Sequence, residues 1–461
     1  MKKKLGLRAL ALLLSLLMLG SLTGCGGDTA LKETNELNFY DPTALKIYDY
    51  GITKVVTGIF NAKYPYIAVN SKNTAFDFSS IKLAAVDLPA EAGYELQEQY
   101  DRLSIDIMKG TADDLIFADT FYRYFDFVTP PDYQKMIRAG AFTDLLPLLK
   151  EELPDFDFSV FDEQLIDGKL YAVPLQRKPY YIYGLENNLK EWNFDLNETD
   201  DILTFLRKCA AWQDANEDNP NAPEVFTKLA WEYIYRNIFN IIGLDVVDYA
   251  AGEANFNTPE LKEILELIFK RRSETEEYIY TELAGYVPTE APKALFGAEW
   301  GAYDSLIIFT LGNNFYQDQS VLVPLLQLDG KAATSSQACY MVPITAENKL
   351  NAIRYIATYL QIMYTYDENN KQEFGFDYYF PYDQGEEAFE SRLEDCKYTV
   401  FSSESYLETN RYMYENQGKV CYPSYWVHSL QSLFDSYMRG EMSIDELMAD
   451  VQSRLEIYVS E

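Results

Sequence analysis

The chain has 461 residues, 48% of them hydrophobic, and a formal net charge of −33 that comes from 72 acidic and 39 basic side chains. The hydrophobic share is enough for a large folded core and excludes disorder as the main state. So negative a chain repels phosphate backbones, which argues strongly against nucleic acid as a partner. The length indicates two or three domains.

The single histidine, His428, limits the chemistry of the chain. Histidine-rich metal sites are excluded, and a Ser-His-Asp triad would have to use that one residue. No glycine-rich phosphate loop of the Walker or dinucleotide type is present, so no cofactor is predicted. Paired carboxylates stay open as catalytic groups, because a chain with 72 acidic residues contains close pairs by chance.

The first 24 residues have the pattern of a secretion signal. Four basic residues precede an apolar region over residues 9–19, which is too short to span a bilayer. Residues 22–25, Leu-Thr-Gly-Cys, resemble the lipobox of bacterial lipoproteins. The resemblance implies cleavage before Cys25 and a diacylglycerol on its thiol, hence an anchor on the extracytoplasmic face of the cell membrane. An uncleaved anchor or an ordinary signal peptide is the alternative.

Strands and helices alternate in the part of the chain that follows. Strands are predicted over 37–40, 66–69 and 115–118, and apolar residues at 3.6-residue spacing predict helices over 52–60 and 96–107. The alternation predicts parallel βαβ units in an open twisted sheet, an α/β fold class.

Ligands of such sheets bind beyond the carboxyl ends of the strands. Tyr40 and Asp41 follow the first predicted strand, and Asp119, Thr120 and Tyr122 follow the third. We therefore expect these five residues at a binding site, although Asp119 could instead cap the next helix.

The organisation changes near residue 168. A turn leads into a strand before residue 174, and a second β-prone run covers 180–183, which we interpret as a first passage between two lobes. Thr199 is expected to cap a helix with apolar residues from 202 to 206. Thr258, followed by proline, is expected to start another helix.

The last third begins with a strand over 321–325. The apolar run 338–343 indicates a second passage, and it contains Cys339, which we expect to be a small buried hydrophobic residue. A helix is predicted over 350–360. Ser443 and Glu446 form a capping box for the final helix. A disulfide between Cys396 and Cys421 stays open.

Four segments resemble, in order and spacing, extracellular solute-binding proteins of the maltodextrin-binding type, the receptors of carbohydrate ABC importers. They are a helix and glycine followed by Asp-Asp-Leu-Ile over 100–116, Gly-Ala-Phe-Thr-Asp-Leu over 140–145, Asp-Gly-Lys-Leu-Tyr-Ala-Val-Pro over 167–174, and the terminal segment 437–455. Asp113 stands where the family usually has proline. The region 374–382 has no counterpart.

The resemblance implies a periplasmic-binding-protein-like α/β fold of two lobes, each a sheet flanked by helices, with the ligand cleft between them. The expected boundaries are 1–24 for the signal, 25–36 for a lipidated tether, 37–175 and 338–395 for lobe 1, 176–337 for lobe 2, and 396–461 for C-terminal helices that pack mainly on lobe 2.

The resemblance also adds residues to the predicted site. Trp300 falls where the family places a stacking aromatic of the second lobe, and Tyr425 and Trp426 fall near the aromatic pair before the final helices. The full predicted ligand-binding set is Tyr40, Asp41, Asp119, Thr120, Tyr122, Arg177, Tyr181, Trp300, Tyr303, Tyr425 and Trp426. Aromatic rings suit the C–H-rich face of a pyranose, and carboxylates accept hydrogen bonds from its hydroxyls. In a chain that is 15% aromatic, each of these rings could instead belong to a core.

The expected function is that of a lipid-anchored receptor that captures a sugar or oligosaccharide and delivers it to an ABC permease. No enzyme activity is expected, and the chain is expected to be a monomer on the membrane of a Gram-positive bacterium. A receptor for a peptide or another small solute is one alternative. A surface glycoside hydrolase with two carboxylates is the other.

Overall fold

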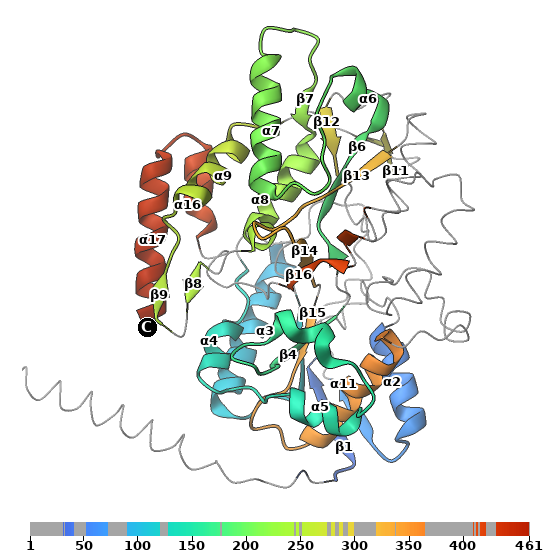
Figure 1. Ribbon diagram of the computed structural model, residues 1–461. Coiled ribbons are helices and arrows are strands. Elements are labelled where there is room, and N and C mark those ends of the chain that lie inside the picture. The colour runs from blue at the N-terminus through green and yellow to red at the C-terminus, as the bar shows by residue number, and fades with distance from the viewer. Residues whose placement is uncertain are drawn as a thin grey trace, which may run out of the picture.

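The computed structural model is shown in Figure 1. It describes residues 31, 33–40, 52–71, 90–119, 128–175, 178–243, 246–248, 251–273, 278–281, 285–288, 294–298, 320–336, 338–364, 409, 412, 413, 415–420 and 430–460.

The first sheet has five strands in the order β2-β1-β3-β15-β4. Their bounds are β1 Glu36–Tyr40, β2 Ala68–Ser71, β3 Leu115–Asp119, β4 Ala172–Leu175 and β15 Ala338–Met341. β1 is parallel to β2 and to β3, whereas β15 is antiparallel to both β3 and β4. The sheet is therefore mixed. The predicted parallel arrangement of the first three strands is confirmed. β15 is antiparallel because it returns from a distant part of the chain, so no βαβ unit sets its direction.

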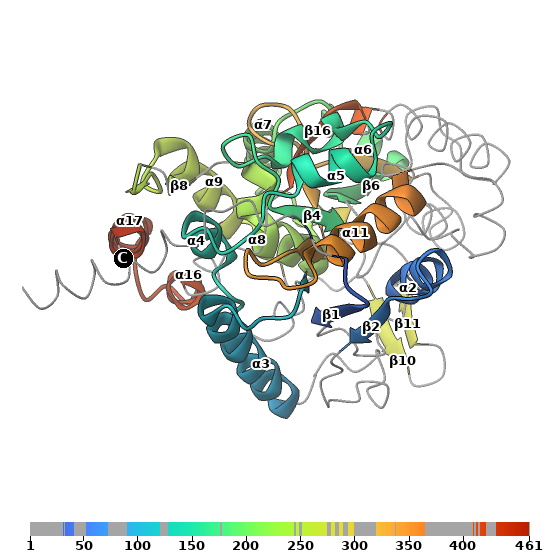
Figure 2. The ribbon, with the colours of Figure 1, turned by 90° about the horizontal axis from the view of Figure 1, so that it is seen from below.

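Helices cover both faces of this sheet. They are α2 Ile52–Lys63, α3 Ala90–Lys109, α4 Tyr133–Arg138, α5 Leu146–Glu152 and α11 Lys349–Tyr364, with a 3₁₀ turn η5 at Phe158–Gln164. Successive side chains of a strand point to opposite faces of the sheet. Leu115 packs with α2, α5 and α11, while Ile116 packs with α3 and α4. Figure 2 shows α3 on the opposite side of β1 from α5 and α11.

The second sheet has the order β13-β6-β12-β7. Its strands are β6 Tyr181–Leu185, β7 Glu224–Phe226, β12 Ala294–Gly297 and β13 Ser320–Pro324. The associated helices are α6 Glu186–Glu191, α7 Ile202–Ala215, α8 Lys228–Ile242, α9 Pro259–Phe269, α16 Gln431–Met438 and α17 Ile444–Ser460. Side chains of β6, β7, β12 and β13 form one buried cluster with side chains from all of these helices.

A three-stranded sheet, β16-β14-β5, lies between the two larger sheets (Figure 1). It consists of β5 Lys178–Pro179, β14 Ala332–Ser335 and β16 Gln417–Val420. Two antiparallel pairs complete the described strands: β8 Val247–Asp248 with β9 Glu253–Ala254, and β10 Tyr278–Thr281 with β11 Gly285–Pro288.

Two of the three predicted helix caps are confirmed. The Thr258 hydroxyl accepts a hydrogen bond from the Leu261 amide at 3.2 Å, directly before the proline that starts α9. At α17, the Glu446 carboxylate accepts from the Ser443 amide at 2.7 Å, and the Ser443 hydroxyl accepts from the Glu446 amide at 3.3 Å. This reciprocal pair is the predicted capping box.

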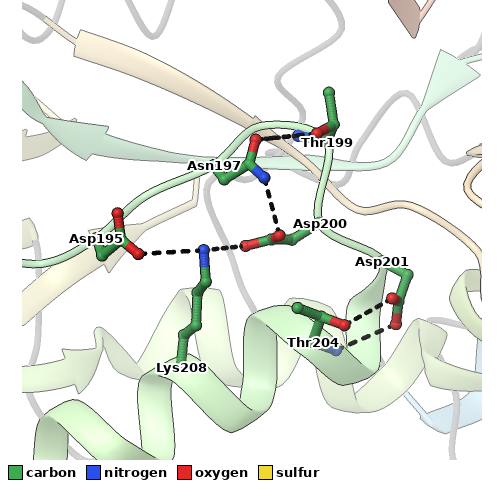
Figure 3. A network of polar contacts seen from close by, with 7 residues as sticks. All are labelled: Asp195, Asn197, Thr199, Asp200, Asp201, Thr204 and Lys208. Carbon is green, nitrogen blue, oxygen red and sulfur yellow. Dashed lines mark hydrogen bonds and ion pairs between the residues drawn. The ribbon is translucent and has the colours of Figure 1, made fainter.

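The third cap prediction, Thr199, was wrong. Asp201 caps α7, because its Oδ1 accepts hydrogen bonds from the amides of Leu203 at 2.9 Å and Thr204 at 3.1 Å (Figure 3). The amide and hydroxyl of Thr199 instead donate to Asn197 Oδ1, at 3.2 and 2.9 Å. A cap residue directly precedes its helix, and α7 begins at Ile202.

The strand β2 begins at Ala68, two residues later than predicted, because the Ile67 amide donates to the Tyr64 carbonyl at 3.0 Å in a turn.

The burial of Cys339 is confirmed, with 2% of the residue exposed. Burial raises the pKa of the Cys339 thiol to about 12. Cys396 and Cys421 lie outside the described residues.

A helix that spans a bilayer needs roughly 20 predominantly apolar residues. No helix in the described part of the chain combines that length with enough apolar character.

Candidate functional site

Three strands of the first sheet end at the same edge of that sheet. β4 and β3 both run antiparallel to β15, so they share one direction, and β1 is parallel to β3. Tyr40, Asp119 and Leu175 therefore end their strands at the edge where β15 begins. The register agrees, since Ala338 pairs with both Asp119 and Leu175.

The second sheet has a corresponding edge. β12 is parallel to β7 and antiparallel to β6, and β6 is antiparallel to β13. The ends of β7, β12 and β13 therefore lie where β6 begins. In the register, Tyr181 pairs with Pro324, and Tyr183 pairs with Gly297.

Two short connections join these edges. The chain leaves the first sheet at Leu175, pairs briefly as β5, and enters the second sheet at Tyr181. It returns from Pro324 through β14 to Ala338. The hydroxyl of Ser336 is buried between the two connections, where it accepts from the Leu175 amide at 3.0 Å and lies 2.6 Å from the Leu175 carbonyl. The two sheets therefore present to each other the strand ends at which α/β proteins bind ligands.

A contact away from these connections also links the two halves. The hydroxyl of Tyr458, on α17, donates to Asp132 Oδ2 at 2.6 Å. The ammonium group of Lys135, on α4, lies 4.0 Å from the centre of the Tyr458 ring. α4 belongs to the first sheet and α17 packs on the second, so rotation of the halves would change this contact.

Tyr40, a predicted site residue, is largely buried. It is 9% exposed and packs with Leu103, Ile107, Ile116 and Tyr133 on the face of the first sheet that α3 and α4 cover. Its position at the end of β1 agrees with the prediction, and most of its ring contributes to this core.

Tyr181 begins β6 at the edge of the second sheet and is 7% exposed. Tyr180 and Ile182 point into the helical core of that sheet, so Tyr181 and Tyr183 lie on its other face. Tyr183 is 1% exposed. Its hydroxyl is one of the buried polar groups in the described part of the chain that have no hydrogen-bond partner. Tyr183 was not in the predicted set, although it lies on the same face of this strand as Tyr181.

Asp119 ends β3 and pairs through its backbone with Ala338; its side chain is outside the described part of the chain. The remaining predicted residues also lie outside the described residues: Cys25, Asp41, Thr120, Tyr122, Arg177, Trp300, Tyr303, Tyr425 and Trp426. Asp41 and Thr120 directly follow the ends of β1 and β3, and Trp300 comes three residues after β12 ends at Gly297. The strands that precede these three residues in the sequence end at the two facing edges.

A metal site needs several histidine, cysteine or carboxylate side chains close together. Within the ranges given above, no three histidine, cysteine, aspartate or glutamate side chains are close enough to hold a metal ion.

No protein-family model and no curated protein matches this sequence. Solved structures match over nearly the whole chain at low sequence identity. The sugar-binding protein MalE from the phytopathogen Xanthomonas citri is 12% identical, with a TM-score of 0.55 over 92% of this chain and 97% of that one. An ABC substrate-binding protein from Listeria monocytogenes, in complex with cycloalternan, is 13% identical, with a TM-score of 0.53 over 93% of this chain and 100% of that one.

A third match is maltose-bound MalE3 of T. maritima, which is 14% identical, with a TM-score of 0.51 over 92% of this chain and 99% of that one. The chain has the solute-binding-protein fold. The two-lobed α/β class predicted from the sequence is therefore confirmed.

Proposed function

We propose that this chain is a lipid-anchored, extracellular substrate-binding component of an ABC importer. It captures a sugar or oligosaccharide between its two halves and delivers it to a permease in the membrane. The observation that carries the proposal is the pair of facing strand edges. Tyr40 and Asp119 end strands at the edge of the first sheet, and Gly297 ends a strand where Tyr181 begins one at the edge of the second. Structures of similar fold include proteins solved with cycloalternan, maltose and α-D-tagatose.

The proposed site combines aromatic rings with carboxylates. Trp300 supplies a ring from the second half, and Asp41 and Asp119 supply acceptors from the first, which suits the C–H faces and the hydroxyls of a pyranose. We add Tyr183 to the site, because a ligand or a bound water would satisfy its buried hydroxyl.

The proposed mechanism is closure of the two halves around the ligand, with no covalent chemistry. A ligand shifts the population toward the closed form only by the contacts that it makes there and not in the open form. It must therefore touch both halves, and short connections such as those at Ser336 are where a hinge motion can take place.

The proposed organisation follows the sequence boundaries. Residues 37–175 and 338–395 form the first lobe, 176–337 form the second, and 396–461 pack mainly on the second. Residues 1–24 are the signal peptide and 25–36 the tether, with the lipid on Cys25, and the mature chain is a monomer at the cell membrane. Side chains of α16 and α17 in the core of the second sheet support the assignment of the C-terminal helices.

The test is a melting experiment on residues 26–461 against a panel of mono- and oligosaccharides, with oligopeptides as the comparison. A ligand at about 100 times its Kd stabilises the folded chain by roughly 2.7 kcal/mol, which raises the Tm by a few degrees. We expect a saturable shift with one group of glycans that is lost in Trp300→Ala. Tyr94→Ala, which removes an exposed ring from α3, serves as the matched control and should keep the shift.

The other outcomes distinguish the alternatives. A shift with peptides alone would replace the sugar by another solute and leave the receptor assignment standing. Hydrolysis of a chromogenic glycoside would show a hydrolase. A shift that persists in Trp300→Ala would remove Trp300 from the site and retain the sugar.

A further inference from the structure

The end of the first sheet opposite the candidate site carries exposed apolar side chains. β1, β2 and β3 are parallel and β15 is antiparallel to β3, so the starts of three strands and the end of β15 share this edge. Tyr66 lies two residues before β2, Met108 lies in the last turn of α3, and Ile344 lies three residues after β15. Ile105 lies one turn before Met108. We call Tyr66, Ile105, Met108 and Ile344 the basal surface.

These side chains are exposed to an unusual degree for large apolar residues. Tyr66 is 55% exposed, Met108 64%, and Ile105 and Ile344 49% each. Four of the six exposed large hydrophobic residues in the described part of the chain belong to this surface. Gly110, just after α3, would bring an added Cβ within 3.0 Å of Thr345, so the end of α3 and the segment after β15 are in contact. Such a concentration of exposed apolar groups is typical of an interaction surface.

The side chains around Tyr66 suit a lipid headgroup layer. The Tyr66 ring meets Tyr64 edge-on at 6.4 Å between centroids. The ammonium group of the exposed Lys63 lies 5.4 Å from the centre of the Tyr64 ring. Tyrosines with a polar tip, together with long basic side chains, are enriched where protein meets the membrane interface.

The chain enters the fold at the same end. The Asn351 side chain, on α11, donates to the Thr34 carbonyl at 3.2 Å, to the Thr34 hydroxyl at 2.8 Å and to the Glu36 carbonyl at 2.8 Å. The Asn35 carbonyl accepts from the Ala68 amide at 2.8 Å, two residues from Tyr66. Thr34 is therefore held beside the basal surface.

This attachment limits the distance between Cys25 and the basal surface. Eight residues separate Thr34 from Cys25, and the nine steps from one Cα to the next reach no further than roughly 30 Å when fully extended. A lipid on Cys25 would therefore keep the basal surface near the bilayer at a high effective concentration, so that even weak contacts form.

We propose that the basal surface lies against the lipid headgroups when the chain is anchored through Cys25, with Tyr66 and Met108 in contact with the bilayer. The proposal rests on the lipid anchor of the proposed function. The facing strand edges lie at the other end of the first sheet, so this orientation presents the candidate site to the medium.

Hydroxyl-radical footprinting tests the orientation. The full chain is produced in a bacterium that lipidates it, reconstituted into phosphatidylcholine vesicles, and compared with soluble residues 26–461 mixed with the same vesicles. Modification of Tyr66 and Met108 should fall at least about twofold in the anchored chain. Tyr94 is the internal control, because it is 65% exposed and lies 14 residues along α3 from Met108, about 21 Å away. Its modification should not change.

Variants identify the contact. Tyr66→Ser should restore modification of Met108 on vesicles, whereas Tyr94→Ser should leave the protection of Met108 intact.

A chain that floats with the vesicles and is modified at Tyr66 and Met108 as in solution overturns the proposal and leaves the anchor standing. Equal protection of Tyr94 and of Ile457, which is 56% exposed on α17, also overturns it. Protection of the soluble chain that rises with protein concentration would show a second copy on this surface and overturns it too. A chain that does not float with vesicles contradicts the lipid anchor, and the proposal fails with it.

Discussion

Replacement of Asp114 by alanine should strongly destabilise the first half of the molecule. Asp114 is 3% exposed and directly precedes β3. Its Oδ1 accepts from the Asn348 amide at 2.8 Å, and its Oδ2 accepts from the Asn348 side chain and the Asn38 amide, both at 2.8 Å. One carboxylate thus joins β1, β3 and the start of α11.

The magnitude follows from the donors that the substitution leaves unpaired. Asn348 is 7% exposed, so its two N–H groups would lose their partner where water enters poorly, whereas Asn38 is only half-buried. A buried unpaired donor costs about 1–3 kcal/mol, so Asp114→Ala should lower the free energy of unfolding by about 4 kcal/mol. Asp114→Asn keeps the shape but turns an N–H group toward a donor, so we expect about half of that loss.

Urea unfolding of residues 26–461, followed by circular dichroism, measures the effect. The two sheets have separate cores, so two transitions are expected, and only the one belonging to the first half should move. With an m-value near 2–3 kcal/mol/M, its midpoint should fall by about 1.5 M. Asp155→Ala, at an exposed carboxylate, is the control. A midpoint for Asp114→Ala within about 0.2 M of the unmodified chain would refute the reasoning.

Three further predictions use the same chain. Thr258→Ala should lower the stability of the second half by about 1 kcal/mol, whereas Thr199→Ala should change it by less than about 0.5 kcal/mol, both measured by urea unfolding. The hydrogen bonds from Ser443 lower the pKa of Glu446, so their contribution is fully present above the ordinary value of 4.5 and disappears as the pH falls through the lowered pKa. An NMR titration of the Ser443 amide should show this step, and Glu446→Gln should abolish it. Cys339, whose thiol pKa is raised to about 12, should resist iodoacetamide at pH 8 until the chain unfolds; labelling of the native chain at this position would contradict its burial.

The parts of the fold that the sequence predicted well are those set by local chemistry. Thr258 before proline and Ser443 before Glu446 carry their cap geometry within four residues, and both helices start as expected. Thr199 misled the prediction because Asp201 offers a second acceptor two residues later, and only the position of α7 chooses between them. The direction of β15 depends on pairing with residues more than 160 positions away, which no local pattern contains.

The candidate site also has features that follow from local sequence and features that depend on distant packing. Strand ends follow from β-prone runs, so the edges at Tyr40, Asp119 and Tyr181 could be predicted. The burial of the Tyr40 ring could not, because it depends on α3 and α4 packing over that face. The reason for proposing Tyr183 could not be predicted either, because a buried hydroxyl without a partner is visible only when the surrounding side chains are in place.

Small-angle X-ray scattering with and without the glycan found by melting tests the central claim most directly. The account predicts that a saturating glycan binds one site per chain and lowers the radius of gyration, because closure brings the two sheet edges together around it. Trp300→Ala should prevent the compaction. Saturable glycan binding with unchanged scattering would contradict a site between the two halves.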